Sequence, residues 1–420
     1  MKNVERSAGY YHGLETESGS QRLERKWFAV RDLLTRAARD SDEFKERLAR
    51  AEVKAEDIWS PEDYARIPVL RKKELLAIQA ERGLSHFLTR EMGTTRRIYL
   101  SPGPLLDPEG KRPDYWGWTE AFFAAGFRPG DLAQMTFSYH LTPAGHMLEE
   151  PLRVIGCAVI PAGPGNTEVQ IDLMTKLPVT GFVGMASYLS SIGQKARDMG
   201  LNPRKDFSLK VAFVAAERLA ESLRRQVEEE FGMVVRQGYG TADVGCIAYE
   251  CPHLGGMHLS SRCWVEICDP ATGAPLPEGQ TGEVVVTPFT DLYPMIRLAT
   301  GDLSRIEAGA CACGRTSAKL AGILGRVDDT AKVKGQFLYP SQVAEVMAKF
   351  PGIKAWQAVV TNPRGKDHLV LHLELAGNLD LAAFERVFQA KCKLKPQVVA
   401  VKPGELGDGA KTLVDQRTFD

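Results

Sequence analysis

Between about residues 97 and 245, short apolar runs alternate with segments of helical periodicity. Strand-like runs such as CAVIPAG, GFVGMA and LKVAFVAAE are each followed by a helix-like segment, for example VQIDLMTKL or RLAESLRRQVEEEF. Apolar strands separated by amphipathic helices are typical of βαβ units, in which parallel strands form a sheet with helices on its faces. This pattern predicts an α/β fold built on a mostly parallel sheet.

The segments on either side of this region have a different character. Residues 21–82 are rich in charged residues, alanine and leucine at helical spacing, which predicts amphipathic surface helices. Residues 264–306 predict strands joined by proline and glycine turns, and therefore a small β unit. Near the C-terminus strands and helices alternate again. We therefore predict a large N-terminal domain over residues 1–326 and a small α+β C-terminal domain over residues 327–420.

The charge balance excludes some classes of protein. Lysine plus arginine and aspartate plus glutamate both number 53, so the chain has no global field to attract polyanions, and we expect no nucleic-acid partner. The N-terminal residues contain no apolar run typical of a signal peptide, and no window approaches the roughly 18 apolar residues that a membrane span needs. We expect a cytoplasmic protein with no membrane partner. The composition leaves the oligomeric state open, a homodimer included.

Four short stretches carry the chemical signal, and they follow one another in order: FVAAERL from residue 213, GYGTADVG from 238, RLATGDL from 297 and GRVDDTAKVKG from 325. In this order, and followed by a small C-terminal domain, they resemble the motifs of the adenylate-forming acyl-CoA ligases, most closely the phenylacetate-CoA ligase branch. The resemblance runs from about residue 60 to the C-terminus. The runs FLYPSQVAEVM and CAVIPAGPGNTEVQ are similar to that branch in particular.

The resemblance implies an ATP-dependent acid:CoA ligase. In this family a carboxylate attacks the α-phosphate of ATP to give an acyl-adenylate and pyrophosphate, and the thiol of coenzyme A then displaces AMP. Both steps develop charge on phosphate oxygens, which calls for Mg²⁺, a cation and oriented donors. The expected ligands are ATP or AMP, Mg²⁺, coenzyme A and a small carboxylic acid. Two alternatives stay open: a non-catalytic relative that binds a nucleotide or acyl group, and an adenylating enzyme with an acceptor other than coenzyme A.

The resemblance also assigns nucleotide-binding roles within the four stretches. Asp243 takes the position of the family's Mg²⁺-binding glutamate and keeps the hard oxygen ligand that Mg²⁺ prefers. Asp302 matches the carboxylate that accepts hydrogen bonds from both ribose hydroxyls. Arg326 matches the arginine near ribose and phosphate, and Tyr239 would stack on adenine. The remaining matches are Ala215, Ala216 and Glu217 beside the purine, and Gly240 and Thr241 in the motif of Tyr239.

Two further positions follow from the resemblance. Asp328 stands where the family has the hinge about which the small domain swings. The run GELGDGAKTLVDQR resembles the family's terminal loop, whose lysine bridges carboxylate and α-phosphate oxygens during adenylation. Lys411 matches that catalytic lysine, although its spacing to Asp415 is shorter than usual in the family. The alternative is a solvated tail lysine.

The stretch RIYLSPGPLLDPEG, residues 97–110, departs from the family pattern. There the family has a strand and then a Ser/Thr/Gly loop ending in Lys-Pro, which wraps the β- and γ-phosphates. Ser101 matches the first hydroxyl, but Pro102 and Pro104 remove two backbone donors, and Asp107 puts a carboxylate in place of the lysine. We expect a stiff, acidic lid that keeps the contacts to adenine, ribose and α-phosphate and repels the distal phosphates.

Six of the eight cysteines lie between residues 246 and 313. Cys251 and His258 in ECPHLGGMH, with Cys311 and Cys313 in CACGRT, would provide three thiolates and one imidazole, which suits tetrahedral Zn²⁺. Four protein ligands leave no position for water, so such a site would be structural. His253 is the alternative ligand, and free thiols are the alternative to a metal. We expect the other three cysteines of this region in the core: Cys246, Cys263 and Cys268.

Aromatic residues mark the expected pocket for the carboxylic acid. Phe137, Tyr139 and His140 lie in TFSYHLTPAG, and Tyr188 follows in GMASY. Aromatic walls with few polar groups favour an aryl or otherwise apolar acid. His140 is equally compatible with a place in the core.

Overall fold

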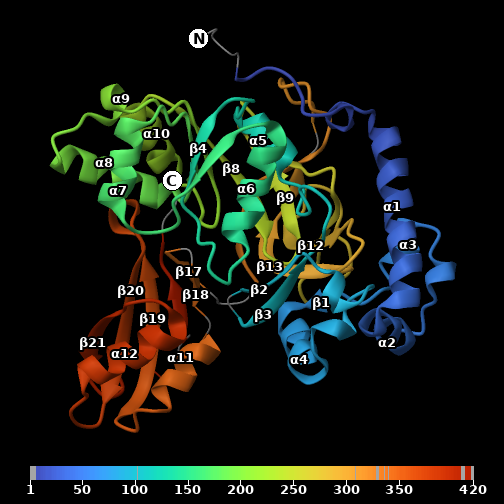
Figure 1. Cartoon of the computed structure of the whole chain (residues 1–420). Coiled ribbons are helices and arrows are strands. Elements are labelled where there is room, and N and C mark those ends of the chain that lie inside the picture. The colour runs from blue at the N-terminus through green and yellow to red at the C-terminus, as the bar shows by residue number, and fades with distance from the viewer. Residues whose placement is uncertain are drawn as a thin grey trace. The chain divides into compact units, whose positions relative to one another are not determined.

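A computed structural model describes residues 6–101, 103–307, 309–327, 331–334, 336–338, 340–407 and 412–417 (Figure 1). The chain divides into two compact units. The first comprises Met1–Gly184, Tyr188–Ala215 and Val227–Val327, and the second comprises Met185–Ser187, Ala216–Gln226 and Asp328–Asp420. Two short segments from within the first 326 residues thus belong to the second unit.

The largest sheet has nine strands, of which five are parallel, as the βαβ pattern predicts. Its central strands are buried along their whole length, which explains why they consist of continuous apolar runs. In paired order the strands are β14 (Ile306–Glu307), β15 (Lys319–Leu320), β10 (Met257–Leu259), β9 (Gly245–Tyr249), β8 (Val234–Thr241), β7 (Val211–Val214), β6 (Gly181–Gly184), β4 (Leu132–Met135) and β5 (Ala158–Pro161).

Helices connect the parallel strands in the expected alternation. Gly126 and Gly156 end α5 and α6 in the left-handed conformation that favours glycine. The helices are α5 (Thr119–Ala125), α6 (Ala144–Ile155), α7 (Thr167–Lys176), α8 (Ala186–Asp198), α9 (Pro203–Asp206) and α10 (Glu221–Phe231). Figure 1 shows α7 to α10 grouped in green. The main core combines buried residues of the large sheet, of α5 and α6, and of the second, five-stranded sheet.

A second sheet has five strands and carries the predicted β unit. Its strands are β1 (Leu70–Arg71), β13 (Leu298–Ser304), β12 (Gly282–Pro288), β11 (Cys263–Cys268) and β16 (Gly325–Arg326). Strand β16 pairs with β13 in a register that places Arg326 opposite Asp302. Two residues far apart in sequence, both assigned to the nucleotide, are therefore neighbours.

The predicted N-terminal helices are present. They are α1 (Gly19–Asp40), α2 (Asp42–Arg50), α3 (Pro61–Tyr64) and α4 (Lys72–Arg82). Ser18 and Gln21 form a capping box that starts α1, and Ser41 caps α2. The apolar faces of α1 and α2 share a core with Ile296, next to the five-stranded sheet. Short 3-10 helices occupy Gly13–Glu15, Ala55–Asp57, Leu84–His86, Met92–Thr94 and Pro363–Gly365.

The stretch expected to form a lid is a β-hairpin. Strands β2 (Arg97–Ser101) and β3 (Leu105–Glu109) pair in antiparallel register, with Ser101 opposite Leu105. Gln79 of α4 exchanges two hydrogen bonds of 2.9 Å with the backbone of Leu106, as a neighbouring strand would. The expectation of a loop over this stretch was therefore wrong for residues 105–109.

The C-terminal part of the chain forms the predicted α+β arrangement. Helices α11 (Pro340–Met347) and α12 (Leu381–Cys392) share a core with a four-stranded sheet (Figure 1). Its strands in order are β21 (Gln397–Val401), β20 (His368–Leu375), β19 (Ile353–Thr361) and β22 (Leu413–Asp415), and a separate ribbon pairs β17 (Ala331–Val333) with β18 (Gln336–Leu338).

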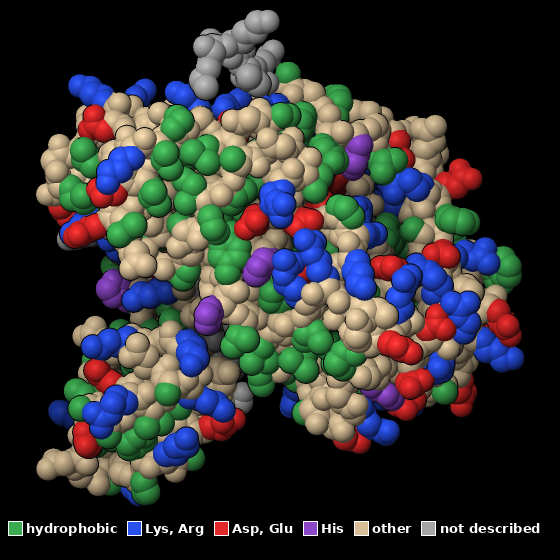
Figure 2. All heavy atoms as spheres, in the orientation of Figure 1, with side chains coloured by type: hydrophobic (Ala, Val, Ile, Leu, Met, Phe, Trp, Pro, Cys, Tyr) green, Lys and Arg blue, Asp and Glu red, His purple; other side chains and the backbone are tan. Residues whose placement is uncertain are grey.

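Among the described residues, none of the helices is both long and apolar enough to cross a bilayer. Basic and acidic side chains are interspersed over the face drawn in Figure 2, in keeping with the balanced composition. The surface of this face therefore offers no broad field of one sign.

Candidate functional site

Three of the predicted nucleotide residues form one hydrogen-bonded group. The hydroxyl of Tyr239 on β8 donates to Asp302 Oδ2 at 2.9 Å, and Arg326 Nη1 donates to Asp302 Oδ1 at 2.5 Å. The Tyr239 oxygen also lies 3.1 Å from Thr300 Oγ1. Both oxygens of a buried carboxylate are thus oriented before any ligand binds. An ionised carboxylate accepts about four hydrogen bonds, so Asp302 keeps capacity for two hydroxyls of a diol.

Thr241, the last residue of β8, and Asp243 follow Tyr239 closely in the sequence. Close packing requires a glycine between Tyr239 and Thr241, because a Cβ at Gly240 would lie 2.1 Å from the carbonyl oxygen of Gly245. Asp243 is buried, and its Oδ2 forms an ion pair with Lys72 at the start of α4. Within the described chain, Asp243 Oδ1 and Thr241 Oγ1 are buried without a hydrogen-bond partner. Two hard oxygen atoms are therefore left for a ligand.

The residues assigned to the other side of the purine follow β7. Ala215 is buried, and Ala216 has a φ of 73°, a left-handed conformation that is strained for a residue with a Cβ. Glu217 accepts hydrogen bonds from the backbone N–H of Ser187 at 2.7 Å and from its hydroxyl at 2.8 Å. The Glu217 carboxylate thus holds the first turn of α8.

Ser101 and Asp107 do not occupy the positions that the expected lid would give them. The Ser101 hydroxyl is buried and donates to the Leu105 carbonyl at 3.5 Å, within the hairpin. The Asp107 side chain is only 1% exposed. Burial, and then the charge of Asp243, raise the pKa of Asp107 to about 8, so this carboxyl is protonated near neutral pH. The burial of Asp107 argues against a charged carboxylate at this position, and its effect on triphosphate binding stays a prediction.

The aromatic residues expected to line the acid pocket have separate hydrogen-bond partners. The Tyr139 hydroxyl donates to Glu149 at 2.7 Å, and the Tyr188 hydroxyl donates to the Gly165 carbonyl at 2.9 Å. Phe137 is half-buried and packs against the main core, whereas His140 is exposed. Because His140 is exposed, it has no place in the core. The acid pocket itself stays a prediction.

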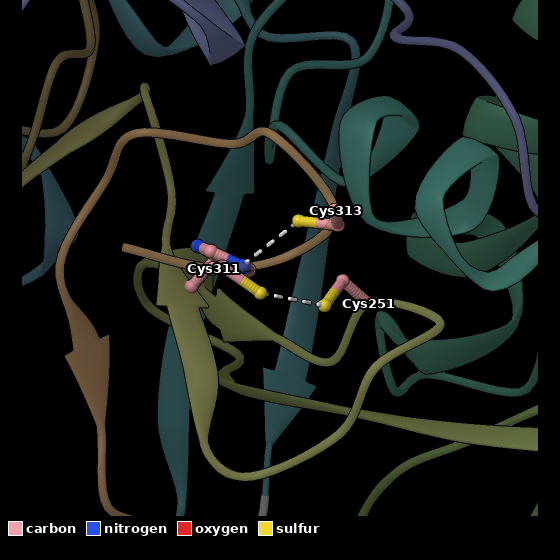
Figure 3. Close-up of side chains that lie close together, drawn as sticks. Cys251, Cys311 and Cys313 are labelled. Carbon is pink, nitrogen blue, oxygen red and sulfur yellow. Dashed lines mark hydrogen bonds between the residues drawn. The ribbon is translucent and has the colours of Figure 1, made fainter. Parts of the chain in front are cut away.

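The four predicted zinc ligands lie together. The ligand atoms of Cys251, His258, Cys311 and Cys313 are all within 4.8 Å of one another. Figure 3 shows the three labelled cysteines converging from two segments of chain, with Cys251 Sγ 3.6 Å from Cys311 Sγ. The alternative ligand His253 is exposed and is not part of this cluster.

The chemistry of this cluster fits a metal ion. His258 Nδ1 lies 3.1 Å from the carbonyl oxygen of Ser317, which leaves Nε2 facing Cys313 Sγ at 3.4 Å. Burial lowers the pKa of His258 to about 4, so the imidazole is neutral, as a ligand must be. The other cysteines of the region, Cys246, Cys263 and Cys268, are buried as expected.

Two assigned residues, Asp328 and Lys411, lie outside the described residues, as does Pro102. Three cations near Asp243 were missed by the sequence analysis: Lys72, Arg112 and Arg262. Lys72 is 171 positions from its partner, and no local pattern connects residues at such a separation. The two arginines line a pocket with Asp243 and come from different loops.

Comparisons with known proteins identify relatives of this chain. A family model for the AMP-binding enzymes matches residues 130–288. The phenylacetate-coenzyme A ligase of Escherichia coli (strain K12) is 30% identical over 331 residues, which cover 75% of each chain. The corresponding ligase of Pseudomonas putida is 26% identical over 384 residues, 88% of this chain and 83% of that one. For that of Thermus thermophilus, 32% identity extends over 259 residues, only 58% of its length.

Solved structures share the fold. A crystal structure of 2-hydroxyisobutyryl-CoA ligase, in complex with 2-HIB-AMP and CoA, superposes with a TM-score of 0.89 at 24% identity, and covers 96% of this chain and 91% of that one. The amide bond synthetase McbA from Marinactinospora thermotolerans gives 0.57 at 16% identity over 75% and 66% of the two chains. These likenesses show that the chain shares the α/β fold of these proteins.

The relatives then define the branch. The chain belongs to the adenylate-forming acyl-CoA ligase superfamily, in its phenylacetate-CoA ligase branch.

Proposed function

We propose that the protein is an ATP-dependent acid:CoA ligase. It joins an aryl or other apolar carboxylic acid to coenzyme A through an acyl-adenylate, and releases AMP and pyrophosphate. The observation that supports this most directly is the carboxylate of Asp302, whose two oxygens accept hydrogen bonds from Tyr239 and Arg326 and keep the capacity to accept two more from a ribose diol. The family membership supports the same activity.

The residues of this site have separate tasks in the reaction. A carboxylate oxygen of the acid attacks the α-phosphorus of ATP, and the bond to the β-phosphate breaks. Asp302 holds the ribose, so the α-phosphate is positioned for in-line attack. Lys411 bridges the carboxylate and α-phosphate oxygens and stabilises their developing charge. The thiolate of coenzyme A then attacks the acyl carbon, and AMP leaves.

Two oxygen atoms of this chain fit a magnesium ion. Asp243 Oδ1 and Thr241 Oγ1 are hard ligands that are buried without a partner among the described residues. We assign Asp243 the task of holding Mg²⁺ when nucleotide is present. Bound there, the ion would neutralise phosphate charge. Lys72 already neutralises one oxygen of Asp243, and both cations can be accommodated because a carboxylate has two oxygens.

We also propose a structural zinc ion at Cys251, His258, Cys311 and Cys313. Three thiolates and an imidazole are the donors that favour this ion. The donor atoms lie within 4.8 Å of one another, and the neutral His258 presents its free nitrogen to them. The zinc ion would connect the loop after β9, which contains Cys251, with the segment after β14, which contains Cys311 and Cys313.

We place the domain boundary between residues 326 and 327, with Asp328 as the hinge of a mobile C-terminal domain. The aromatic wall of the acid site is assigned to Phe137, Tyr139 and Tyr188. We further propose that the protein is cytoplasmic. Its assembly as a homodimer stays open.

The activity is tested by exchange of labelled pyrophosphate into ATP with a panel of aryl and fatty acids. Acid-dependent exchange, followed by thioester formation with coenzyme A, is the expected result. Exchange without thioester formation would move the acceptor to a carrier-protein thiol or an amine, and absence of exchange with every acid would contradict the proposal.

One observation favours a second candidate, a non-catalytic nucleotide-binding relative. The hairpin β2–β3 stands where the family's phosphate loop would lie, and it buries Ser101 and Asp107. Such a relative would bind AMP without exchanging pyrophosphate. Pyrophosphate exchange and thioester formation therefore separate the two candidates, because only the ligase shows both.

A further inference from the structure

A small pocket beside Asp243 combines aromatic walls with two arginines. Arg112 lies in the loop after β3, and Arg262 lies just before β11. The remaining lining residues are Tyr115, Trp116, Val244, Pro288, Phe289, Thr290 and Tyr293. The protein thus places two guanidinium groups in one cavity, next to the carboxylate that we assign to Mg²⁺.

Both guanidinium groups have buried N–H donors that make no hydrogen bond within the described chain. These donors are Arg112 Nε and Arg262 Nη2. Arg112 Nη2 is held by the carbonyl oxygens of Tyr115 and Phe289, at 3.2 and 3.1 Å, so its side chain is fixed and the free donor is not a result of disorder. An unpaired buried donor costs about 1–3 kcal/mol, and more when it is charged. A native site with two such donors calls for a partner.

The charges in the pocket indicate which kind of ligand fits it. Neither arginine forms an ion pair with any described carboxylate, and Asp243 is already neutralised by Lys72. Asp291 and Asp114 act on Arg112 only from a distance, each more weakly than Arg262 does, so both guanidinium groups remain without an ion-pair partner among the described residues. Burial, and then the nearby charge of Arg262, lower the pKa of Arg112 to about 10, which shows that the two groups repel each other. An anion with several oxygens would relieve this repulsion and accept from both donors.

We propose that Arg112 and Arg262 form an oxyanion site for a distal phosphate group of the nucleotide, in place of the phosphate loop that this chain lacks. The inference rests on the proposed function for its ligand, because Asp243 on the pocket wall is the residue assigned to the magnesium ion that accompanies those phosphates. The pocket is small, with room for about one water-sized group, so a single phosphate oxygen can enter it but a whole phosphate group or the adenosine cannot. The two guanidinium groups would thereby supply donors that the proline-containing stretch of the sequence lacks.

Inorganic pyrophosphate is the probe that tests the site, because its binding needs no acid and no catalysis. Titration calorimetry compares the wild type with Arg262→Gln and Arg112→Gln, each with pyrophosphate, ATP and AMP. Each variant is expected to bind pyrophosphate and ATP at least about tenfold more weakly, the loss of one charge-assisted hydrogen bond, and AMP with unchanged affinity. Arg262→Lys should recover part of the loss, since it restores the charge without the planar fork.

Lys111→Gln provides the matched control, because Lys111 is exposed and adjacent to Arg112 and its loss changes the net charge equally. Thermal unfolding confirms that each variant is folded. A wild type that does not bind pyrophosphate would show that the pocket holds water only. That result, an unchanged affinity in both arginine variants, or an equal loss in Lys111→Gln overturns the inference. The proposed ligase activity fails separately, if acids promote no exchange in the wild type.

Discussion

Replacing Asp302 by alanine should remove nucleotide binding without unfolding the protein. Two charge-assisted hydrogen bonds to the ribose hydroxyls are worth about 1.5–3 kcal/mol each. Their joint loss of about 3–6 kcal/mol corresponds to AMP affinity that is weaker by at least about 100-fold. The fold should tolerate the change, because Tyr239 keeps Thr300 as a neighbour at 3.1 Å and the Arg326 side chain is 23% exposed and can be hydrated.

Calorimetry with AMP and ATP measures this effect, and two further variants locate its origin. Asp302→Asn keeps the shape and loses the charge, so it should bind with intermediate affinity. Tyr239→Phe removes only the hydroxyl that orients Asp302 Oδ2, and should cost about tenfold or less. If Asp302→Ala bound AMP within threefold of the wild type, Asp302 would not be the ribose ligand, and the constellation would be structural.

Four more outcomes can be checked on single variants. Purified wild type should contain one zinc ion per chain by elemental analysis, and Cys311→Ser should lose it; a wild type without metal contradicts the site. Asp107→Asn should leave the ratio of ATP to AMP affinity unchanged, since its side chain is buried, and a marked rise in ATP affinity would restore the repulsive role. Ala216→Gly should raise the free energy of unfolding by about 0.5–1 kcal/mol in denaturant titration, because it relieves a left-handed backbone, and a loss would show that the strain is absent. Burial raises the pKa of Glu43 above its usual 4.5, so between the two pKa values the folded state retains a proton that the unfolded chain releases. Stability therefore falls as the pH rises above 4.5. Glu43→Gln should flatten this fall of the melting temperature with pH, and an unchanged slope would refute the assignment.

The arrangement of secondary structure could be predicted because it is local. Apolar runs such as GFVGMA become strands that are buried on both faces, and a strand of that kind has a continuous apolar sequence. The hairpin was missed because its second strand, LLDPE, contains a proline and an aspartate, which argue against a strand. A distant residue, Gln79, adds two hydrogen bonds to the backbone of Leu106, and no local pattern announces them.

The residues of the candidate site also fall into two groups: those in local sequence motifs and those contributed by distant parts of the chain. Asp302, Asp243 and the four proposed zinc ligands belong to short motifs, so chemistry and resemblance pointed to them. The structure brings the four proposed ligands together, and it places Asp302 beside Tyr239 and Arg326. Lys72 and Arg262 lie in no motif. Lys72 pairs with Asp243, which lies 171 positions away, and Arg262 lines a pocket with residues from several other segments. Sequence reasoning also treated Asp107 as charged, because the burial that neutralises it is a property of the folded hairpin.

The ligase and the non-catalytic candidate differ at the distal phosphates, and the two arginines bear on that difference. Adenylation requires pyrophosphate as the leaving group, oriented in line with the attacking carboxylate, so a ligase needs donors at the β- and γ-phosphates. A protein that binds only AMP needs none, and would keep two buried guanidinium groups unpaired at a cost of about 1–3 kcal/mol for each free donor. If the arginine variants lose pyrophosphate exchange and retain AMP binding, the site serves catalysis, and the hairpin has replaced the phosphate loop without removing its function. If they retain exchange, the in-line geometry depends on other groups.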